Sequence, residues 1–381
     1  MSSAQRLLLN RTAVDRVIQM RVLLIEDMPS TSGIGRYAFS LATESKKIGG
    51  QDVEVLSLDS GTLNSLLSKA SGHPLLHRIG QVMNVSWKTL GSYRVPAGYQ
   101  VYHLTNASLS PIARRFKPSV VTVHDLIPFM PWIRSSFIDF FLKLSTRDIV
   151  HADRVLCDSE STRKDVIRMM DVEPKKTRVV YLGVDHNLFR RRDKRRTRLG
   201  LNLPVDRVTV LNVGTEESRK NIVTLLNAFK NLLKYVPGAI LVRIGQRSEK
   251  SDSLIRGLGL DGKVIYKYPS AWEVAYYYNA ADMLCFPSYH EGFGFPPLEA
   301  MASGLPVLAG NRSSIPEIIG DSGIMLDPFD VEGFAHWMYE LSKNNDLRAS
   351  ISEKGYKRSL NFTWSKCAKE CYQVYKELSL R

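Results

Sequence analysis

The feature that most constrains the fold is an alternation, along most of the chain, between short β-rich apolar runs and longer stretches with helical periodicity. Such an alternation is typical of α/β proteins with parallel sheets, because the crossover between two parallel strands is long enough to hold a helix. We predict strands at residues 21–25, 53–56, 101–104, 120–123, 154–157, 179–182, 208–213, 239–244, 264–266, 283–286 and 306–309. We predict helices at residues 37–48, 132–152, 161–170 and 221–235, and a mainly helical tail from residue 331.

The alternation occurs twice, and 381 residues are too many for one ordinary core. It stops after Gly183-Val-Asp185, passes through a basic stretch and restarts near residue 208. The basic stretch 190–198 holds seven Lys or Arg residues against Asp193 alone, and we interpret it as part of a solvated linker. We therefore predict two Rossmann-like doubly wound domains. The predicted segments are 1–19 (N-terminal extension), 20–188 (first domain), 189–206 (basic linker), 207–362 (second domain) and 363–381 (C-terminal helix).

The chain carries a net charge of +14. Such a charge attracts phosphate groups, whether in a nucleotide, an anionic membrane surface or a nucleic acid, although a solvated basic face without any partner is the plain alternative. A nucleic-acid-binding protein is the weakest of these interpretations, because the cations do not interleave with aromatic residues along one face and no nucleic-acid-binding module is recognisable. We therefore expect no nucleic-acid partner.

The sequence favours a cytoplasmic protein. No apolar run reaches the roughly 18 residues that a transmembrane helix needs. The run Leu7-Leu8-Leu9 is too short for the apolar region of a signal peptide. The four cysteines include no metal-like CxxC pair, and their number fits a reducing compartment.

Two glutamates follow the strand predicted at 283–286, in the segment Glu291-Gly-Phe-Gly-Phe-Pro-Pro-Leu-Glu299. Ligands of open parallel sheets bind outside the carboxyl ends of the strands, so in two such domains we expect the site in the cleft between them. Two prolines suit the first turn of a helix that runs to about Ser303 and stops at Gly304. The start of that helix offers free N–H groups to an anion, and the two carboxylates suit sugar and ribose hydroxyls.

A pair of cations, Arg219 and Lys220, follows the strand predicted at 208–213 and the turn at Gly214, and lies where the next helix opens. Cations at a helix N-terminus are electrostatically misplaced unless an anion sits there. The pair therefore predicts a site that neutralises a diphosphate through charge-assisted hydrogen bonds, with a solvated helix start as the alternative.

Two further motifs follow strands of the first domain. Gly33 and Gly35 form a glycine loop that lacks the dinucleotide-binding GxGxxG spacing, and His124 comes directly after the strand at 120–123. A histidine at the carboxyl end of such a strand faces the ligand crevice, unless it only supports a loop by hydrogen bonding. No metal-ligand spacing and no Asp-x-Asp pair is present, so we expect no metal ion.

The segment Pro287-Ser-Tyr-His-Glu291 to Val307 resembles the glutamate-x7-glutamate signature of the retaining glycosyltransferases of family 4, also described as glycosyl transferases group 1. The likeness continues in Gly214-Thr-Glu-Glu-Ser-Arg219-Lys220 and covers nearly all of the chain from about Met20 on. It implies the glycosyltransferase B fold, with an acceptor-side first domain, a second domain that binds the nucleotide sugar, and a final helix that crosses back to the first domain. Because relatives begin near Met20, we expect residues 1–19 to lie outside the catalytic fold and treat Met20 as an alternative start.

The resemblance also implies the roles of individual residues. The diphosphate would lie against Arg219 and Lys220, the donor sugar against Glu291 and His124, and the ribose against Glu299. The full donor-binding set comprises Gly33, Gly35, Gly214, Arg219, Lys220, Glu291, Gly292, Phe293, Gly294, Phe295 and Glu299, and the catalytic set comprises His124, Arg219, Lys220 and Glu291.

The implied reaction moves a sugar, with retention, from a nucleoside diphosphate sugar to a hydroxyl of a glycan or lipid-linked acceptor. The donor is a substrate, and neither a cofactor nor a metal ion is expected. The segment His124-Asp-Leu-Ile-Pro128 looks like that of mannosyltransferases and other polysaccharide-assembly enzymes, which favours GDP-mannose. A lipid-linked acceptor and the basic charge suggest a peripheral position on the inner membrane face. A sugar-nucleotide epimerase or a phosphorylase on the same fold is the alternative.

Overall fold

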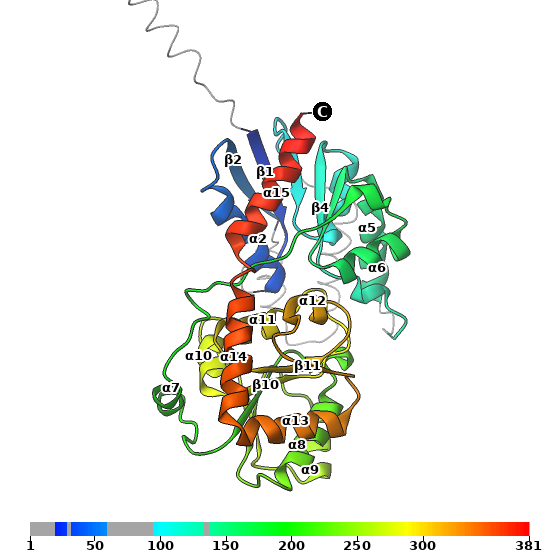
Figure 1. Ribbon diagram of the computed structural model, residues 1–381. Helices are drawn as coiled ribbons and strands as arrows, with labels where there is room; N and C mark the ends of the chain where they lie inside the picture. The colour runs from blue at the N-terminus through cyan, green and yellow to red at the C-terminus, as the bar shows by residue number, and fades with distance from the viewer. Residues whose placement is uncertain (1–19, 29–31, 59–93, 133–136, 381) are drawn as a thin grey trace, which may run out of the picture. The chain divides into compact units, whose positions relative to one another are not determined.

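A computed structural model describes residues 20–28, 32–58, 94–132 and 137–380, which divide into two compact units (Figure 1). The first unit combines the described residues up to Asp158 with Arg163–Val180 and the segment from Trp364. The second unit comprises Ser159–Thr162 and Tyr181–Thr363. The predicted N-terminal extension, residues 1–19, lies outside the described residues.

The first unit is built on a parallel sheet of six strands in the order β2-β1-β3-β4-β5-β6. Its strands are rich in valine, leucine and isoleucine, and β3 and β4 are buried along their whole length, as expected for a sheet that helices cover on both faces. The strands are β1 (Met20–Glu26), β2 (Gln51–Ser57), β3 (Val101–Leu104), β4 (Ser119–Val123), β5 (Arg154–Cys157) and β6 (Thr177–Val179).

Helices of the first unit connect these strands, and the last helix of the chain packs against α2, β1 and β3 (Figure 1). The α-helices are α2 (Gly33–Ser45), α5 (Phe137–Thr146), α6 (Glu160–Met170) and α15 (Trp364–Ser379). Short 3-10 helices are η1 (Ala107–Arg114), η2 (Ile127–Phe129), η3 (Arg147–His151) and η4 (Pro174–Lys176). The buried face of α15 carries Cys367, Cys371 and Tyr375, whose four-residue spacing places them on one side of the helix.

The second unit is built on a parallel sheet of six strands in the order β12-β11-β10-β7-β8-β9. The strands are β7 (Thr209–Val213), β8 (Ile240–Ile244), β9 (Val264–Lys267), β10 (Met283–Phe286), β11 (Val307–Gly310) and β12 (Ile324–Leu326). From β7 the chain first builds one half of the sheet, through β8 to β9, and then returns to add β10 on the other side of β7. The point where the strand order reverses therefore lies between β7 and β10, and this is where doubly wound sheets bind ligands.

Helices cover both faces of this sheet, with α8, α9 and α13 on one side of β10 and β11 and α10, α11 and α12 on the other (Figure 1). The helices are α7 (Lys194–Gly200), η5 (Ser218–Lys220), α8 (Ile222–Leu233), α9 (Glu249–Leu258), α10 (Val274–Ala280), α11 (Phe295–Ala302), α12 (Ile315–Ile319), α13 (Val331–Lys343) and α14 (Asn345–Ser359). The apolar faces of α8 and α13 meet the sheet in a buried core that includes Phe229, Leu241 and Phe334.

The observed fold class is the predicted one, but four local predictions were wrong. The strand expected at 179–182 lies at Thr177–Val179 instead, because Val180, Leu182 and Val184 are buried without being part of a strand. The helix expected at 132–152 gives way after Thr146 to the tighter turns of η3. Strand β12 was missed because it has only three residues. Helix α2 begins at Gly33, before the predicted start at residue 37.

The basic stretch that we expected to be solvated contains α7, and Arg198 of this helix is only 4% exposed. The guanidinium of Arg198 donates to the carbonyls of Ala280, Val205 and Arg207 and to the carboxylate of Asp282, at 2.7–3.0 Å. A buried cation is tolerated when it is paired and fully hydrogen-bonded, and Arg198 meets both conditions. The charge run therefore includes an anchor that ties α7 to the start of β10.

Candidate functional site

The predicted cations and the first predicted glutamate meet at the carboxyl ends of β7 and β10, which are hydrogen-bonded neighbours. Arg219 and Lys220 lie in η5, which follows β7, and Glu291 lies in the loop that follows β10. The chain places these residues far apart in sequence, and the reversal of strand order brings their loops together. This cluster in the second unit is the centre of the candidate site.

Glu291 accepts hydrogen bonds from both cations. Nζ of Lys220 lies 2.7 Å from one carboxylate oxygen of Glu291, and Nη1 of Arg219 lies 2.7 Å from the other. Oγ of Ser288 also lies 2.5 Å from the oxygen that Lys220 contacts. Arg219 has a further carboxylate partner, Glu217, at 2.8 Å from Nε. In the protein alone, the two cations are therefore held by two carboxylates.

The burial of this cluster strengthens its interactions. The side chains of Lys220 and Glu291 are about nine-tenths buried, at 10% and 9% exposure. Burial alone would raise the pKa of Glu291, but the charges of Lys220 and Arg219 outweigh it and hold the pKa below the usual value. Burial lowers the pKa of Lys220, against the opposing attraction of Glu291. The carboxylate therefore stays ionised beside its cations at neutral pH.

The loops that carry the cluster are fixed to each other by hydrogen bonds to backbone carbonyls. The amide of Tyr289 donates to the carbonyl of Arg219 at 2.9 Å, and the hydroxyls of Ser313 and Ser314 donate to the carbonyl of Glu291 at 2.6 and 3.0 Å. Three segments that follow β7, β10 and β11 are thus tied together. Such cross-links hold the charged side chains in one geometry, which a site for a charged ligand requires.

A buried arginine of β8 shapes the turn at Gly214. Arg243 is fully buried, and its guanidinium donates to the carbonyls of Gly214 and Thr215 at 3.0 and 2.9 Å. It also donates to the side chains of Asn212 and Glu216 at 2.5 and 3.0 Å. Gly214 has φ +151°, and a Cβ there would lie 3.5 Å from the side chain of Lys220. The backbone of Gly214 therefore packs directly beneath the lysine stem.

The segment predicted to open a helix does so. Gly294 precedes α11 with φ +117°, a left-handed conformation that favours glycine, and prolines occupy the first turn. Phe293 is buried and packs edge-on against Phe295, whereas Gly292 lies in the loop before them. The helix ends at Ala302 and Gly304 follows with φ +72°, close to the predicted stop.

Glu299, the second predicted glutamate, lies on α11 and is buried. It accepts a hydrogen bond from the hydroxyl of Tyr278 of α10 at 2.8 Å. A buried carboxylate needs such a donor, because leaving it without hydrogen bonds is costly. The hydroxyl therefore helps to orient Glu299.

Gly33, Gly35 and His124 belong to the first unit. Gly33 and Gly35 lie in the first turn of α2, and the hydroxyl of Ser32 accepts a hydrogen bond from the amide of Gly35 at 2.9 Å. Both glycines are thus inside a capped helix start and not in a free loop. Tyr37, one turn further along α2, and His124 form a T-shaped ring pair, with 5.0 Å between the ring centroids.

Both ring nitrogens of His124 face acceptors. Nδ1 lies 2.6 Å from a carboxylate oxygen of Asp158, and Nε2 donates to the carbonyl of Thr105 at 2.9 Å. Burial opposes protonation of the ring, but the charge of Asp158 and these hydrogen bonds outweigh it and raise the pKa of His124 above 6.5. Because both nitrogens already face acceptors within the first unit, the ring orientation is fixed by Asp158 and Thr105.

Three residues of this site were not among the predicted ones: Ser288, Tyr278 and Arg243. Ser288 lies inside the quoted Pro-Ser-x-x-Glu segment, so its position three residues before Glu291 was a usable signal. Tyr278 and Arg243 touch the site only through packing between elements. No sequence pattern predicts which residues a tyrosine in a helix or an arginine within an apolar strand will contact.

Two further findings concern the residues that the structure describes. In these ranges, no group of three or more His, Cys, Asp or Glu side chains is arranged to hold a metal ion, and the absence of a catalytic metal stays a prediction. Within the same part of the chain, every helix is too short or too polar to cross a membrane.

Two family models match the chain. Residues 31–188 match the model described as glycosyltransferase family 4, and residues 193–358 match the model described as glycosyl transferases group 1. The chain is 27% identical to the O-antigen chain mannosyltransferase B of Escherichia coli, over 91% of this chain and 96% of that relative. It is 30% identical to the D-inositol 3-phosphate glycosyltransferase of Corynebacterium kroppenstedtii, over 60% of this chain and 54% of that relative.

Solved structures share the fold. Sucrose-phosphate synthase from Thermosynechococcus elongatus matches with a TM-score of 0.71 at 20% identity, over 94% of this chain and 99% of that chain. Anabaena Alr3699/HepE in complex with UDP-glucose matches with a TM-score of 0.71 at 19% identity, over 94% of this chain and all of that chain. The family models, the sequence relatives and the two parallel six-stranded sheets agree, and the chain belongs to the glycosyltransferases of the family 4 and group 1 type, with the glycosyltransferase B fold.

Proposed function

We propose that this glycosyltransferase moves a sugar from a nucleoside diphosphate sugar to a hydroxyl of a glycan or lipid-linked acceptor, with retention of the anomeric configuration. The observation that carries the proposal is the convergence of Arg219 and Lys220 on buried Glu291 where the strand order of the second sheet reverses. Two cations at such a point suit a diphosphate, and a neighbouring carboxylate suits the hydroxyls of the sugar attached to it.

In the proposal, the diphosphate of the donor replaces Glu291 as the partner of Arg219 and Lys220. The phosphate oxygens offer the same charge-assisted hydrogen bonds that the carboxylate supplies in the protein alone. Glu291, released from one or both cations, then accepts hydrogen bonds from the hydroxyls of the donor sugar. Before the donor binds, Glu291 pairs with both cations. Without it, two buried cations would be unpaired, which would be energetically costly.

In the proposal, the site lowers the barrier mainly by stabilising the charge that develops on the leaving diphosphate. As the bond between the anomeric carbon and the phosphate oxygen breaks, negative charge grows on the diphosphate beside Arg219 and Lys220. The start of α11, around Phe293, Gly294 and Phe295, turns backbone N–H groups and the positive end of the helix dipole toward the same charge. Fixed donors that face a developing charge stabilise the transition state more than the ground state.

The other predicted residues position the two substrates. Glu299 accepts hydrogen bonds from the ribose, with Tyr278 holding its carboxylate in place. In the proposal, His124 lies against the transferred sugar, with its ring held in place by Asp158 and Thr105. In the proposal, the first turn of α2, with Gly33 and Gly35, lies near the diphosphate and the acceptor.

Retention follows when the acceptor attacks from the face that the diphosphate leaves. The bond from the acceptor oxygen to the anomeric carbon forms while the bond to the phosphate oxygen breaks. The proton of the acceptor hydroxyl passes to an oxygen of the departing diphosphate. No protein nucleophile and no metal ion takes part, because the side-chain cations already balance the leaving charge.

The donor that we propose is GDP-mannose. The segment from His124 to Pro128 and the similarity to an Escherichia coli mannosyltransferase support it. The structure of HepE with UDP-glucose supports a nucleotide-sugar donor in general. Thermal-shift measurements against GDP-, UDP- and ADP-sugars separate the choices, because the ligand that binds the folded protein most tightly raises its melting temperature most.

Acceptor dependence separates transfer from other reactions on this fold. With the preferred donor, a transferase releases nucleoside diphosphate only when an acceptor is present, and nuclear magnetic resonance of the product reports its anomeric configuration. Product of inverted configuration would exclude retention. Conversion of the donor without an acceptor would favour an epimerase, and a need for inorganic phosphate a phosphorylase. Activity that survives chelation with EDTA supports the metal-free mechanism, and loss restored by a divalent cation refutes it.

A further inference from the structure

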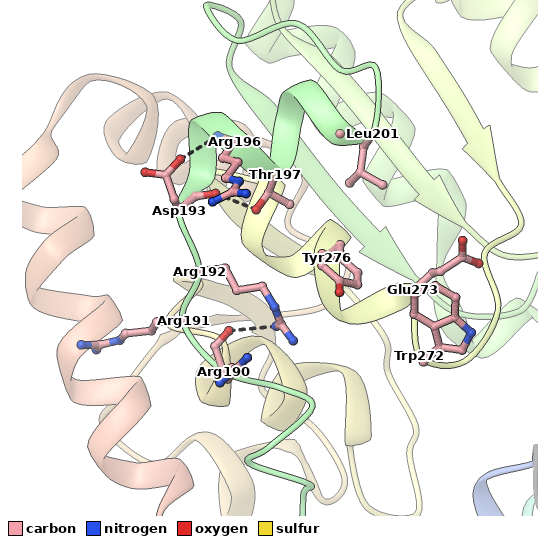
Figure 2. A pocket seen from close by; sticks show the side chains of 11 residues that line it. Arg190, Arg191, Arg192, Asp193, Arg196, Thr197, Leu201, Trp272, Glu273 and Tyr276 are labelled. Carbon is pink, nitrogen blue, oxygen red and sulfur yellow. Dashed lines mark hydrogen bonds between the residues drawn. The ribbon is translucent and has the colours of Figure 1, made fainter.

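A pocket of about 600 Å³ lies between α7 and α10 in the second unit (Figure 2). One wall is formed by α7 and the chain that leads into it, with Arg190, Arg192 and Arg196, and the other is the start of α10, with Trp272 and Tyr276. The pocket contains none of the residues of the Arg219–Lys220–Glu291 cluster. Its volume lies within the range of ordinary small-molecule sites.

The charge of this pocket is only partly balanced by the protein. Arg191 points away from it toward α14, where it pairs with Glu353 at 2.8 Å. The acidic residues at the rim are engaged elsewhere: Asp193 caps α7 through the amide of Arg196, and Glu273 accepts from the amide and hydroxyl of Ser270. With Arg191 paired outside the pocket, Arg190, Arg192 and Arg196 still outnumber the carboxylates of Asp193 and Glu273, so positive charge is left over at the pocket mouth.

Two exposed arginines supply this charge. Within the part of the chain that the structure describes, the guanidinium groups of Arg190 and Arg196 have no ion-pair or hydrogen-bond partner. Guanidinium groups bind carboxylates and phosphates through two parallel hydrogen bonds. The pocket therefore offers two such groups to an anion.

The aromatic wall offers a surface of a different kind. Trp272 is 58% exposed, and its ring lies nearly perpendicular to that of Tyr276, at 83° with 6.2 Å between centroids. The guanidinium of Arg192 covers Tyr276 at 4.8 Å, so the indole of Trp272 is the larger open face. An exposed tryptophan beside arginines is a combination that is enriched where proteins bind partners.

We propose that this pocket binds a saccharide that carries a phosphate or a carboxylate. The sugar ring would lay its C–H face on the indole of Trp272, while Arg190 and Arg196 bind the anionic group. A corner of two perpendicular rings suits a puckered sugar better than a flat nucleobase, which prefers parallel stacking. The inference concerns a second site and does not rest on the proposed reaction.

The test is calorimetric binding of glucose 6-phosphate at low salt, with neither donor nor acceptor present. We expect binding that is tighter than that of inorganic phosphate and of methyl glucoside, because only the sugar phosphate engages both walls. The double variant Arg190→Ala/Arg196→Ala should lose about ten-fold or more in affinity, because the anionic group then has neither guanidinium partner. Glucuronate in place of glucose 6-phosphate tests the carboxylate.

Matched variants locate the site. Lys250→Ala removes an exposed cation of α9 that does not line the pocket, and it should bind glucose 6-phosphate as the unmodified protein does. Trp272→Ala should weaken binding, and Trp272→Phe should restore part of it. Equal affinity for inorganic phosphate and the sugar phosphate would overturn the proposal, as would unchanged binding in the double variant. Because no turnover is measured, a failure here leaves the proposed reaction untouched, and the reverse also holds.

Discussion

The ammonium of Lys220 lies 2.7 Å from a carboxylate oxygen of Glu291, and both side chains are buried, although 71 positions separate them in the sequence. A buried pair of this kind contributes little net stability while it is intact, but removing one partner typically costs about 3–5 kcal/mol. The pair therefore serves two purposes. It holds the loops after β7 and β10 together, and in the proposed reaction it is the contact that the diphosphate of the donor replaces.

Lys220→Ala is expected to lower turnover by about 10- to 100-fold, because one charged hydrogen bond of about 1.5–3 kcal/mol to the departing diphosphate is lost. The contact strengthens as the leaving charge grows, so kcat should fall more than donor binding weakens. Steady-state kinetics on one donor measures this, with circular dichroism to confirm folding. Near-native turnover in a folded Lys220→Ala protein would contradict the assigned role.

Glu299→Ala is expected to raise KM for the donor more than it lowers kcat, because a ribose contact changes little during the reaction. Tyr278→Phe is the matched variant, since it removes the hydroxyl that contacts Glu299 and leaves the carboxylate in place. It should show a smaller rise in KM. A variant of Glu299 that loses turnover at unchanged KM would move this residue from the ribose to the reacting atoms.

The sequence predicted the fold well because its signals are local. Each buried strand such as β4 is a short apolar run, and each connection is long enough for a helix, so alternation alone defines the class. The helix start at Gly294 was also predictable, because prolines in a first turn and glycine before it reflect backbone geometry. An apolar run predicts a strand less reliably where residues are buried outside regular secondary structure. Val180 and Leu182 are an example, because both are buried but lie outside any strand.

The site was predictable only in part, because charge pairing depends on tertiary structure. Motifs identified Arg219, Lys220 and Glu291, but nothing in their spacing indicated that the cations would be paired with the carboxylate. The same holds for Arg198, which a charge run marks as solvated and which the fold buries against Asp282. A sequence motif identifies a charged residue, whereas its ion-pair partner lies in a segment that is distant in the sequence.

A pH prediction follows from His103, which is fully buried between the hydroxyls of Thr122 and Tyr375, at 2.7 and 2.6 Å. Burial, aided by the charge of His124, lowers the pKa of His103 from 6.5 to about 3. The unfolded chain binds a proton below pH 6.5 that the folded protein excludes. The free energy of unfolding should therefore fall as pH drops from 6.5 toward 3, by at most about 1.4 kcal/mol per pH unit from this residue.

The measurement is urea unfolding of the first unit between pH 7.5 and 5, for the unmodified protein and for His103→Gln. The variant should lose less stability as pH falls, because glutamine keeps hydrogen-bonding capacity without titrating. His124 acts in the opposite direction, since its raised pKa gives a contribution that is present below pH 6.5 and lost at higher pH. Identical pH profiles for the two proteins below pH 6.5 would show that His103 is not held neutral.

Association with anionic membranes is expected to be weak and salt-sensitive, because each basic residue near a charged bilayer contributes about 1 kcal/mol. The net charge of +14 and the lipid-linked acceptor that we propose motivate this expectation. Flotation with anionic liposomes should fall as salt rises, since the Debye length shortens. Equal recovery with neutral liposomes would rule out an electrostatic attraction.

The last prediction concerns Arg243, which bonds the carbonyls of Gly214 and Thr215 and the carboxylate of Glu216 from a fully buried position. Arg243→Met should destabilise the second unit by about 3–5 kcal/mol, because Glu216 loses its buried cation and the turn loses two hydrogen bonds. Glu216→Gln alone should also destabilise, since it leaves the guanidinium without a countercharge. The double variant should be more stable than the sum of the two losses predicts, because no charge is then left unpaired.

Thermal unfolding of the unmodified protein, the two single variants and the double variant measures this coupling. Donor affinity measured on the same four proteins reports whether the turn at Gly214 keeps its conformation. The double variant should be more stable than Arg243→Met alone but should not regain donor affinity. The guanidinium that bonds the carbonyls of Gly214 and Thr215 is still missing from it. Additive losses of stability would show that Arg243 and Glu216 do not act as a pair.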